Sequence, residues 1–233
     1  MVDKALGQHW LKNREILNEI ATLAGAGGLC VEIGPGLGTL TTSLLKRFDR
    51  VLAVEFDSKL AQNLPKSFPG TNLEVVNADI LKFDFAGITE PYVVAGNIPY
   101  YITSPIIEKL LTVSNLPEKI VLLMQKEVAE RICDTKESVL SLFVKNRANA
   151  SLGPVVLRGE FEPVPKVDSR VLILEPFKDG PKYDEKVLKT IKVAFKNPRK
   201  KLKHNLPGVI EEYADLRPEN LHLDDYFKIM QNQ

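Results

Sequence analysis

The sequence has little of what disulfide-linked, metal-binding or membrane-spanning proteins require. Its two cysteines, Cys30 and Cys133, form neither a Cys-x-x-Cys pair nor a spacing typical of a metal site. We therefore expect reduced, structural thiols and no bound metal. No apolar run approaches the roughly 18 residues of a membrane span, and the start, Met1-Val2-Asp3-Lys4, lacks the apolar core of a signal peptide. These absences predict a cytoplasmic protein that contacts no membrane.

The chain also lacks an excess of charge of either sign. Its 31 Lys and Arg residues nearly balance 30 Asp and Glu residues, so that only local clusters of charge can indicate a partner. Hydrophobic residues make up 44% of the sequence, which is ordinary for a globular protein. A chain of 233 residues can bury a full core, and we expect one α/β domain with a small appendage. Nothing suggests an obligate oligomer, and we expect a monomer.

A short run, Asn97-Ile98-Pro99-Tyr100, carries chemistry at the end of a predicted strand. The apolar segment 92–95 has the pattern of a buried strand, which the following glycine is predicted to end. In open α/β sheets, ligands bind at the carboxyl ends of strands. There the Asn97 side-chain oxygen and the carbonyl of Ile98 or Pro99 can accept the two N–H groups of an amine on a planar base, while Tyr100 stacks on the ring. An ordinary turn is the alternative, because Asn and Pro favour turns.

A glycine-rich segment, Gly34-Pro35-Gly36-Leu37-Gly38, follows another predicted strand at 29–33. Glycines at a strand-to-helix turn let backbone N–H groups and a helix N-terminus approach a ligand closely. The nicotinamide-binding pattern is Gly-x-Gly-x-x-Gly, whereas the spacing here is Gly-x-Gly-x-Gly. With Glu32 just before the glycines, the segment suits S-adenosylmethionine better than a dinucleotide. A nicotinamide-dependent oxidoreductase is the alternative that this spacing disfavours.

Two acidic residues follow the next two predicted strands, at 51–54 and 73–76. Glu55 is placed to accept both ribose hydroxyls of a bound adenosine. Asp79 can accept the adenine amino group, with Ile80 covering the ring. Each acid alone is more typical of a solvated turn. Three successive predicted strands each end at residues suited to bind part of an adenosine. Together they predict an adenosine-containing cofactor.

The remaining pattern alternates helices with strands and predicts an α/β fold with a Rossmann-like sheet. Helices are expected at about 13–24, 39–48 and 59–68, after residue 103 and around residues 127–131. A fifth buried strand is expected at 120–124. Strands at 155–158 and 170–174 are separated by a segment that fits no helix, which predicts an antiparallel hairpin closing the sheet. Phe161 in that segment is either a core aromatic residue or a second stacking face for a base, opposite Tyr100.

A composition shift at 176–181 predicts a linker between a domain at 1–176 and a small helical domain at 177–233. From Lys186 to Ile210 the chain has eight Lys or Arg residues and no acid. Such a run is usually a solvated face, but its acid-free density favours contact with nucleic acid. The predicted RNA-binding residues are Lys196, Arg199, Lys200, Lys201 and Lys203.

In this order the motifs resemble those of the ribosomal RNA adenine N6,N6-dimethyltransferases, the family of the kasugamycin-resistance methyltransferase. The matching segments span nearly the whole chain and comprise Gly7–His9, Glu32–Gly38, Asn97–Tyr100, Gln125–Arg131 and Phe161–Ser169. The resemblance implies a class I S-adenosylmethionine-dependent methyltransferase core with a small helical C-terminal domain. It also implies that the substrate is small-subunit ribosomal RNA in a pre-ribosomal particle, and that Gln8 and its neighbour help to enclose the cofactor.

The predicted site has two parts. The residues expected at the target base are Asn97, Pro99, Tyr100 and Phe161. The residues expected to bind S-adenosylmethionine are Gln8, His9, Leu11, Glu32, Gly34, Gly36, Gly38, Glu55, Phe56, Asp79, Ile80 and Asn97. The expected reaction places two methyl groups on N6 of an adenosine, with no general base, because the proton becomes acidic only after the nitrogen gains its methyl.

Three alternatives keep a similar fold. Large-subunit adenine methyltransferases that confer macrolide resistance share the core and the Asn-Ile-Pro motif, but Gln8-His9 and Lys166–Ser169 favour the small-subunit branch. A DNA adenine methyltransferase is disfavoured by the RNA-type flanking motifs. A non-catalytic ribosome-assembly factor is disfavoured by the intact Asn97, Tyr100, Glu55 and Asp79.

Overall fold

The computed structural model describes residues 9–232, so Gln8 lies outside the described residues. The chain forms two compact units. The first comprises the chain up to Ala129 together with Ser151–Pro176, and the second comprises Glu130–Ala150 together with the chain from Phe177 onward. The second unit thus includes a segment that the predicted division placed in the first domain.

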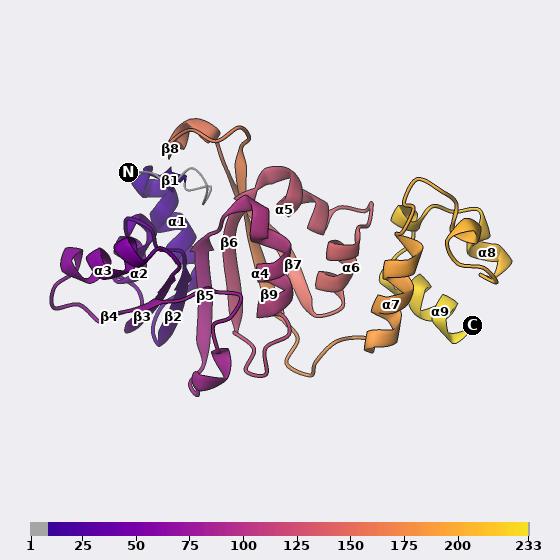
Figure 1. The fold of residues 1–233 in the computed structure, drawn as a ribbon, viewed down its shortest axis with the longest axis horizontal. Helices are drawn as coiled ribbons and strands as arrows, with labels where there is room; N and C mark the ends of the chain where they lie inside the picture. Colours follow the sequence, from indigo (N-terminus) through magenta and orange to yellow (C-terminus); the bar gives the residue numbers. More distant parts are fainter. Residues whose placement is uncertain (1–8, 233) are drawn as a thin grey trace. The chain divides into compact units, whose positions relative to one another are not determined.

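A mixed sheet lies at the centre of the first unit, with the strand order β4-β3-β2-β5-β6-β9-β7 (Figure 1). Its strands are β2 (Leu29–Ile33), β3 (Arg50–Glu55), β4 (Leu73–Asn77), β5 (Tyr92–Asn97), β6 (Lys119–Gln125), β7 (Ala148–Val156) and β9 (Ser169–Pro176). The strands from β4 to β6 pair in parallel, and β9 pairs antiparallel to β6. The strand order reverses between β2 and β5, which is where α/β sheets bind ligands. The predicted α/β fold class is confirmed.

Helices connect the strands and form most of the second unit. They are α1 (Arg14–Ala24), α2 (Thr39–Leu44), α3 (Ser58–Ser67), α4 (Thr103–Leu110), α5 (Lys126–Cys133), α6 (Val139–Lys145), α7 (Glu185–Ala194), α8 (Glu211–Ala214) and α9 (Leu223–Gln231). Asn13 caps α1 by accepting a hydrogen bond from the backbone N–H of Glu15 at 3.0 Å. No helix between residues 9 and 232 combines the length and the apolar character needed to cross a membrane.

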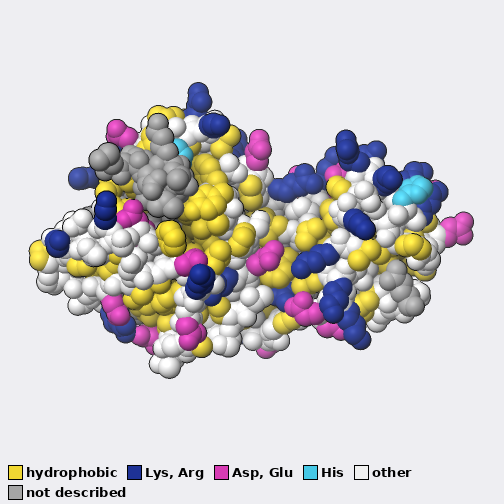
Figure 2. Space-filling view, in the orientation of Figure 1, with side chains coloured by type: hydrophobic (Ala, Val, Ile, Leu, Met, Phe, Trp, Pro, Cys, Tyr) yellow, Lys and Arg dark blue, Asp and Glu magenta, His cyan; other side chains and the backbone are white. Residues whose placement is uncertain are grey.

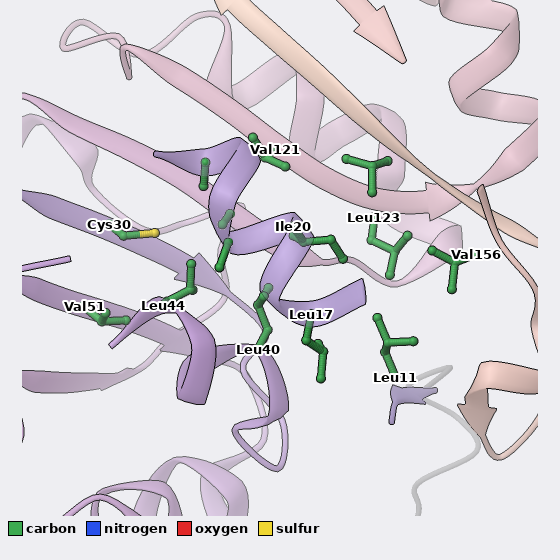
Figure 3. Close-up of a cluster of buried hydrophobic side chains, with 14 of the residues drawn as sticks. Leu11, Leu17, Ile20, Cys30, Leu40, Leu44, Val51, Val121, Leu123 and Val156 are labelled. Atoms are coloured by element: carbon green, nitrogen blue, oxygen red, sulfur yellow. The ribbon is translucent and has the colours of Figure 1, made fainter. Parts of the chain in front are cut away.

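The core beside the sheet is built by α1 and α2. Figure 3 shows Leu17 and Ile20 of α1 among Leu40 of α2 and Leu123 of β6, and all four side chains are buried. The helical spacing of apolar residues in 13–24 places them on one face of α1, and this face covers the sheet. Burying these side chains stabilises the packing of α1 and α2 against the sheet.

Gly96 does not end β5, contrary to the prediction. The strand continues to Asn97, and Gly96 pairs with Ile33 of β2 in register. A Cβ atom at Gly96 would lie 2.8 Å from the Ile33 carbonyl oxygen, so the residue is a glycine because two strands approach closely here. Asn97 is consequently held as the last residue of a central strand rather than in a flexible loop.

A small second sheet joins two segments for which the sequence predicted no strand. Its strands β1 (Trp10–Leu11) and β8 (Phe161–Glu162) pair antiparallel, with Leu11 opposite Phe161. The Lys12 backbone N–H donates to the Glu160 carbonyl at 2.9 Å, and Asn13 Nδ2 donates to Glu160 Oε2 at 3.0 Å. Residues 9–13, which we call the N-terminal strap, are therefore tied to the connection between β7 and β9.

The second unit has its own apolar core. It contains residues of α6, α7 and α9 together with the intervening turns, including Leu142, Ile191, Leu202 and Tyr226, all buried. Leu142 explains why residues 130–150 group with the C-terminal helices, since α6 contributes to this core. The densest basic segment is not a regular helix, because the only helical turn in 197–204 is the short 3-10 turn Leu202–His204.

Candidate active site

A cavity of about 260 Å³ opens at the carboxyl ends of the parallel strands of the first unit. Ten of the residues predicted for the site line it: His9, Gly34, Gly36, Glu55, Phe56, Asp79, Ile80, Asn97, Pro99 and Tyr100. Four predicted residues do not line it: Leu11, Glu32, Gly38 and Phe161. The parallel topology brings the first group together because strand ends distant in sequence meet at one edge of the sheet.

Glu55 ends β3 as a buried carboxylate, with only 6% of the residue exposed. The backbone N–H of Gly36 donates to its Oε2 at 3.0 Å, and that of Asp57 donates to its Oε1 at 2.8 Å. Burial raises the pKa of Glu55, and these backbone hydrogen bonds act in the opposite direction. Each carboxylate oxygen keeps a further lone pair, which suits a pair of vicinal hydroxyl groups as ligand.

The glycines of the strand-to-helix turn have different roles. Gly34 and Gly36 line the cavity with φ values of 63° and 58°, which favour glycine. A Cβ atom at Gly36 would lie 2.8 Å from Nε1 of Trp10, so the indole packs directly on this backbone. Gly38 was expected at the cofactor but lies outside the cavity, and a Cβ atom there would lie 2.6 Å from the Phe68 ring. The close packing of this turn against Phe68 accounts for the third glycine.

Glu32 lies beneath the glycine turn rather than in the cavity. It is 1% exposed, and the Thr41 hydroxyl donates to its Oε2 at 2.6 Å. Burial raises the pKa of Glu32 to about 8. Together with Leu11 it borders a separate small cavity of about 20 Å³, which Gly34 and Asn97 also line. Neither Glu32 nor Leu11 therefore reaches a ligand in the large cavity in this arrangement.

The end of β4 supplies a second carboxylate beside apolar surface. Asp79 Oδ1 accepts the Leu81 backbone N–H at 2.9 Å, which leaves Oδ2 for a ligand. Ile80 is 7% exposed and Phe56 is 62% exposed, and both line the same cavity as Asp79. Two carboxylates that accept hydrogen bonds, with apolar side chains between them, match the hydroxyl groups and flat ring of an adenosine. The residues present therefore fit the nucleoside part of S-adenosylmethionine.

Asn97 is oriented by the N-terminal strap. Its Nδ2 donates to the backbone carbonyl of His9 at 2.8 Å, so its Oδ1 remains as an acceptor. The Pro99 carbonyl already accepts the Ile102 N–H at 3.3 Å, whereas among residues 9–232 no donor contacts the Ile98 carbonyl. Of the two backbone acceptors considered from the sequence, Ile98 is thus the better placed partner for Oδ1.

Tyr100 is half-buried and fixed at two points. Its hydroxyl lies 2.8 Å from Oγ of Ser169, and burial raises its pKa. Its ring lies nearly parallel to the His9 ring, with an interplanar angle of 23° and centroids 6.1 Å apart. The ring of Tyr100 consequently has a defined plane beside Asn97.

Phe161 does not face Tyr100 across the cavity. It is 1% exposed and belongs to the core cluster that contains Leu11 and Leu17. Pairing of β8 with β1 turns the ring into this core. The expectation of a second stacking face at Phe161 is corrected by this placement, since a fully buried ring offers no face to an incoming base.

Three aromatic or polar residues are among the residues of the site that were not predicted from the sequence. Trp10 and Tyr101 line the cavity, and Tyr101 is 63% exposed at its mouth. Ser169 is fully buried against Tyr100. The single tryptophan beside the Gln8-His9 motif was an available signal for Trp10. Ser169 ends the Phe161–Ser169 segment on which the family resemblance depends, but that pattern does not contain its contact with Tyr100.

The predicted RNA-binding residues lie in the second unit. Figure 2 shows dark blue Lys and Arg side chains over the visible face of this unit, with some acidic side chains among them. Asp215, outside the acid-free run, pairs with Lys201 at 3.1 Å and Lys203 at 2.8 Å. The other three, Lys196, Arg199 and Lys200, are exposed and form no ion pair with any residue in 9–232. Part of the basic run is therefore neutralised within the fold.

Comparison with known proteins gives matches over nearly the whole chain. Residues 2–218 match the family model described as "Ribosomal RNA adenine dimethylase". Ribosomal RNA small subunit methyltransferase A of Mycoplasma mycoides subsp. mycoides is 34% identical over 253 residues, covering 97% of this chain and 95% of the relative. The protein of the same name from Geobacter sulfurreducens is 38% identical over 221 residues, covering 88% and 80% respectively.

Solved structures show the same extent of similarity. A dimethyladenosine transferase from Plasmodium falciparum superposes with a TM-score of 0.80 at 28% identity, covering 94% of this chain and 95% of that chain. The 23S rRNA methyltransferase ErmE gives a TM-score of 0.78 at 25% identity, covering 96% and 98%. Both matches therefore extend over the second unit as well as the first.

Proposed function

Because this chain belongs to the ribosomal RNA adenine dimethylase family, we propose that it transfers methyl groups from S-adenosylmethionine to N6 of adenosines in small-subunit ribosomal RNA. One observation carries the proposal at the level of residues. The Asn97 amide is held by the His9 carbonyl, so its oxygen is left as an acceptor in the same cavity as the Glu55 and Asp79 carboxylates. A hydrogen-bond acceptor for the target amine therefore lies in the same cavity as the carboxylates suited to bind an adenosine.

The cavity lining supports an assignment of the cofactor-binding residues. Glu55 would bind the ribose hydroxyls, Asp79 would accept the adenine amino group, and Ile80 and Phe56 would cover the ring. Gly34 and Gly36 let the backbone approach the ligand without a side chain in the way. When bound, S-adenosylmethionine supplies an electrophilic methyl group on its sulfonium centre.

Asn97 prepares the target nitrogen for attack. The lone pair of an aromatic amine is delocalised into the ring, which makes the amine a poor nucleophile. Hydrogen bonds from its two N–H groups to Asn97 Oδ1 and the Ile98 carbonyl favour a more tetrahedral nitrogen, and Tyr100 stacks on the base. Most of the rate enhancement then comes from positioning, with reacting atoms about 3 to 3.5 Å apart.

The proposed chemistry requires no general base. The amine proton becomes acidic only once the nitrogen has gained a methyl group, and water can then accept it. A neutral carboxamide at position 97 agrees with this role, since the amide accepts a hydrogen bond without taking the proton. The same arrangement can serve a second transfer, because a monomethylated amine still has one N–H group to donate.

The relatives indicate the kind of RNA. The curated relatives reported above are named as small-subunit methyltransferases, whereas one structural neighbour acts on 23S rRNA by its name. We propose a pre-ribosomal small-subunit particle as substrate, a monomeric enzyme and a cytoplasmic location. The exposed Lys196, Arg199 and Lys200 of the second unit would contact RNA phosphates.

Labelled S-adenosylmethionine tests the function directly. Immature small or large subunits are incubated with the protein, and dimethyladenosine is mapped in the RNA. We expect the label in the small-subunit RNA alone. Label confined to the large subunit would support the 23S-type activity instead, and no label in either RNA would contradict the proposed reaction.

Asn97→Ala tests the residue assignment in the same assay. Removing the acceptor should reduce methyl transfer by at least about 100-fold, as loss of a single oxyanion-type hydrogen bond does in other enzymes. Cofactor affinity, measured by calorimetry, should stay within about threefold of the wild type. An unchanged transfer rate would remove Asn97 from its proposed role.

A further inference from the structure

We propose that Asp168 is a positioning residue for the target base, which holds the connection between β7 and β9 at its ends and carries Ser169 against Tyr100. This inference deepens the proposed function and rests on it. Asp168 does not line the cavity, so it acts through other residues. The carrying observation is that its carboxylate and its carbonyl accept backbone N–H groups from two other segments. Oδ1 accepts that of Arg158 at 2.9 Å, and the carbonyl accepts that of Lys126 at 3.0 Å.

The carboxylate of Asp168 closes the segment 158–168 at its two ends. Arg158 is the first residue of a short 3-10 turn, and its N–H group donates to Oδ1 of Asp168. The chain leaves β7 shortly before this turn and enters β9 directly after Asp168. The hydrogen bond therefore joins the points at which the connection leaves and re-enters the sheet. A connection held at both ends has fewer conformations than a free one.

The same connection holds the N-terminal strap. The Glu160 carbonyl accepts the Lys12 backbone N–H at 2.9 Å, and the strands β8 and β1 pair beside this contact. Nδ1 of His9 lies 2.7 Å from the Pro163 carbonyl. The His9 carbonyl in turn accepts a hydrogen bond from the Asn97 amide at 2.8 Å. The position of the connection therefore sets the orientation of the Asn97 side chain through the strap.

The backbone of Asp168 supports Tyr100 separately. Lys126 is the first residue of α5, and its N–H group donates to the Asp168 carbonyl. The next residue, Ser169, pairs with Gln125 at the end of β6. Ser169 is fully buried, with its Oγ 2.8 Å from the Tyr100 hydroxyl. One residue thus connects to both side chains proposed to hold the target base.

The carboxylate acts as a hydrogen-bond acceptor and not as an ion-pair partner. Asp168 is half-buried, and it forms no ion pair with any residue in 9–232. The backbone group that it accepts is uncharged. An asparagine presents the same Oδ1 acceptor without the charge. Asparagine at position 168 should therefore preserve the role, whereas alanine should abolish it.

The experiment compares Asp168→Ala with Asp168→Asn in the full chain, with immature small subunits as substrate. Loss of the acceptor should lower kcat roughly 5- to 20-fold, because Asn97 and Tyr100 are then held less precisely. With asparagine, kcat should stay within about twofold of the wild type. Calorimetry with S-adenosylmethionine counts the folded binding sites, so that kcat is expressed per folded molecule. Cofactor affinity should change less than about threefold in either variant.

A second pair of variants removes the same hydrogen bond from the donor side. Arg158→Pro lacks the N–H group that Asp168 accepts, whereas Arg158→Ala loses only the side chain. Proline suits this position, because Arg158 begins a 3-10 turn and Leu157 before it is extended, with a ψ of 144°. We expect kcat of Arg158→Pro to lie roughly 5- to 20-fold below that of Arg158→Ala.

The loss of activity should also depend on Asn97. A positioning residue has less effect once the group that it positions is absent, so Asp168→Ala should cost at most about threefold in an Asn97→Ala background. A general structural defect would lower activity by the same factor in both backgrounds.

Asp84→Ala is the matched control. Oδ1 of Asp84 accepts the Ala86 backbone N–H at 2.9 Å, the same kind of contact at the same distance, and Asp84 does not line the cavity. Its kcat should stay within about twofold of the wild type.

Four outcomes would overturn the role of Asp168. They are full activity in Asp168→Ala, equal losses in Asp168→Ala and Asp168→Asn, equal kcat in Arg158→Pro and Arg158→Ala, and the same loss in both backgrounds at position 97. A wild-type protein that methylates neither ribosomal subunit would instead contradict the proposed function.

Discussion

The hydroxyl group of Tyr100 lies 2.8 Å from the hydroxyl group of Ser169, and Ser169 is fully buried at the start of β9. Ser169 pairs with Gln125 at the end of β6, so the contact ties the aromatic ring to the antiparallel side of the sheet. Asn97 ends the neighbouring parallel strand β5. Strands on both sides of β6 therefore fix Asn97 and Tyr100, the two side chains proposed to hold the target base.

This hydroxyl pair predicts coupled effects on stability. Tyr100→Phe or Ser169→Ala alone leaves one buried hydroxyl without its partner and should lower the free energy of unfolding by about 1 to 3 kcal/mol. The double variant should cost less than the sum of the two, because no unpaired hydroxyl remains. Urea denaturation of the four proteins measures the coupling. Additive effects within error would mean that the contact contributes nothing.

Glu55→Gln should weaken cofactor binding. An amide has one acceptor and one donor, so its nitrogen would face a backbone N–H of Gly36 or Asp57 that the carboxylate now accepts. Loss of a charge-assisted hydrogen bond to the ribose predicts a fall in cofactor affinity of roughly 10- to 150-fold. Calorimetry with S-adenosylmethionine measures this affinity. Glu74→Gln, at an exposed carboxylate on β4, is the control and should bind normally; wild-type affinity in Glu55→Gln would exclude Glu55 from the site.

Glu32 predicts a pH dependence of stability. Its pKa is raised from an ordinary 4.5 to about 8, so the folded protein retains a proton that the unfolded chain releases. The resulting contribution of Glu32 to the free energy of unfolding is complete below pH 4.5. It is lost as the pH rises towards 8, at up to about 1.4 kcal/mol per pH unit. Glu32→Gln removes this titration while its amide oxygen can still accept from Thr41.

The difference in the free energy of unfolding between the wild type and Glu32→Gln should therefore shift in favour of the variant from pH 5 to pH 8. Urea denaturation across this range measures it. Glu55 is still present in both proteins, so its own titration largely cancels in the difference. A difference that stays constant with pH would show that Glu32 is ionised in the folded state.

The basic residues of the second unit predict a change in salt dependence. Arg199 and Lys200 form no ion pair among the described residues, so Arg199→Gln with Lys200→Gln should remove two phosphate contacts. The slope of log K against log salt for RNA binding should become less steep by roughly 1.4 to 1.8. Filter binding at several salt concentrations measures the slope.

Two comparisons make this prediction specific. Lys46→Gln with Lys66→Gln changes the charge equally at exposed positions of the first unit and should leave the slope unchanged. Asp215→Asn releases Lys201 and Lys203 from their ion pairs and should steepen the slope. Equal slopes for the wild type and the Arg199–Lys200 variant would mean that this segment is simply a solvated face.

The sequence by itself predicted the parallel strands β2 to β6 to within two residues at each end, although it ended β5 before Gly96 and missed β1, β8 and most of β7. Leu29–Ile33 forms β2 with the predicted bounds, and Glu55 and Asn97 end their strands. Local apolar patterns report strands because a central strand must be buried on both faces. Since parallel strands end at one edge, the convergence of Glu55, Asp79 and Asn97 followed from their sequence positions. The resemblance to ribosomal RNA adenine dimethyltransferases is confirmed by the family match over residues 2–218.

Only the tertiary structure decided the features that depend on contacts between distant segments. Gly96 continues its strand because Ile33 approaches it, and Phe161 is buried because β8 pairs with β1. Asp215 neutralises two lysines of a run that contains no acid. The orientation of the Asn97 amide comes from the His9 carbonyl, 88 residues away along the chain. No local pattern contains such a contact, because its energy depends on a partner that folding brings near.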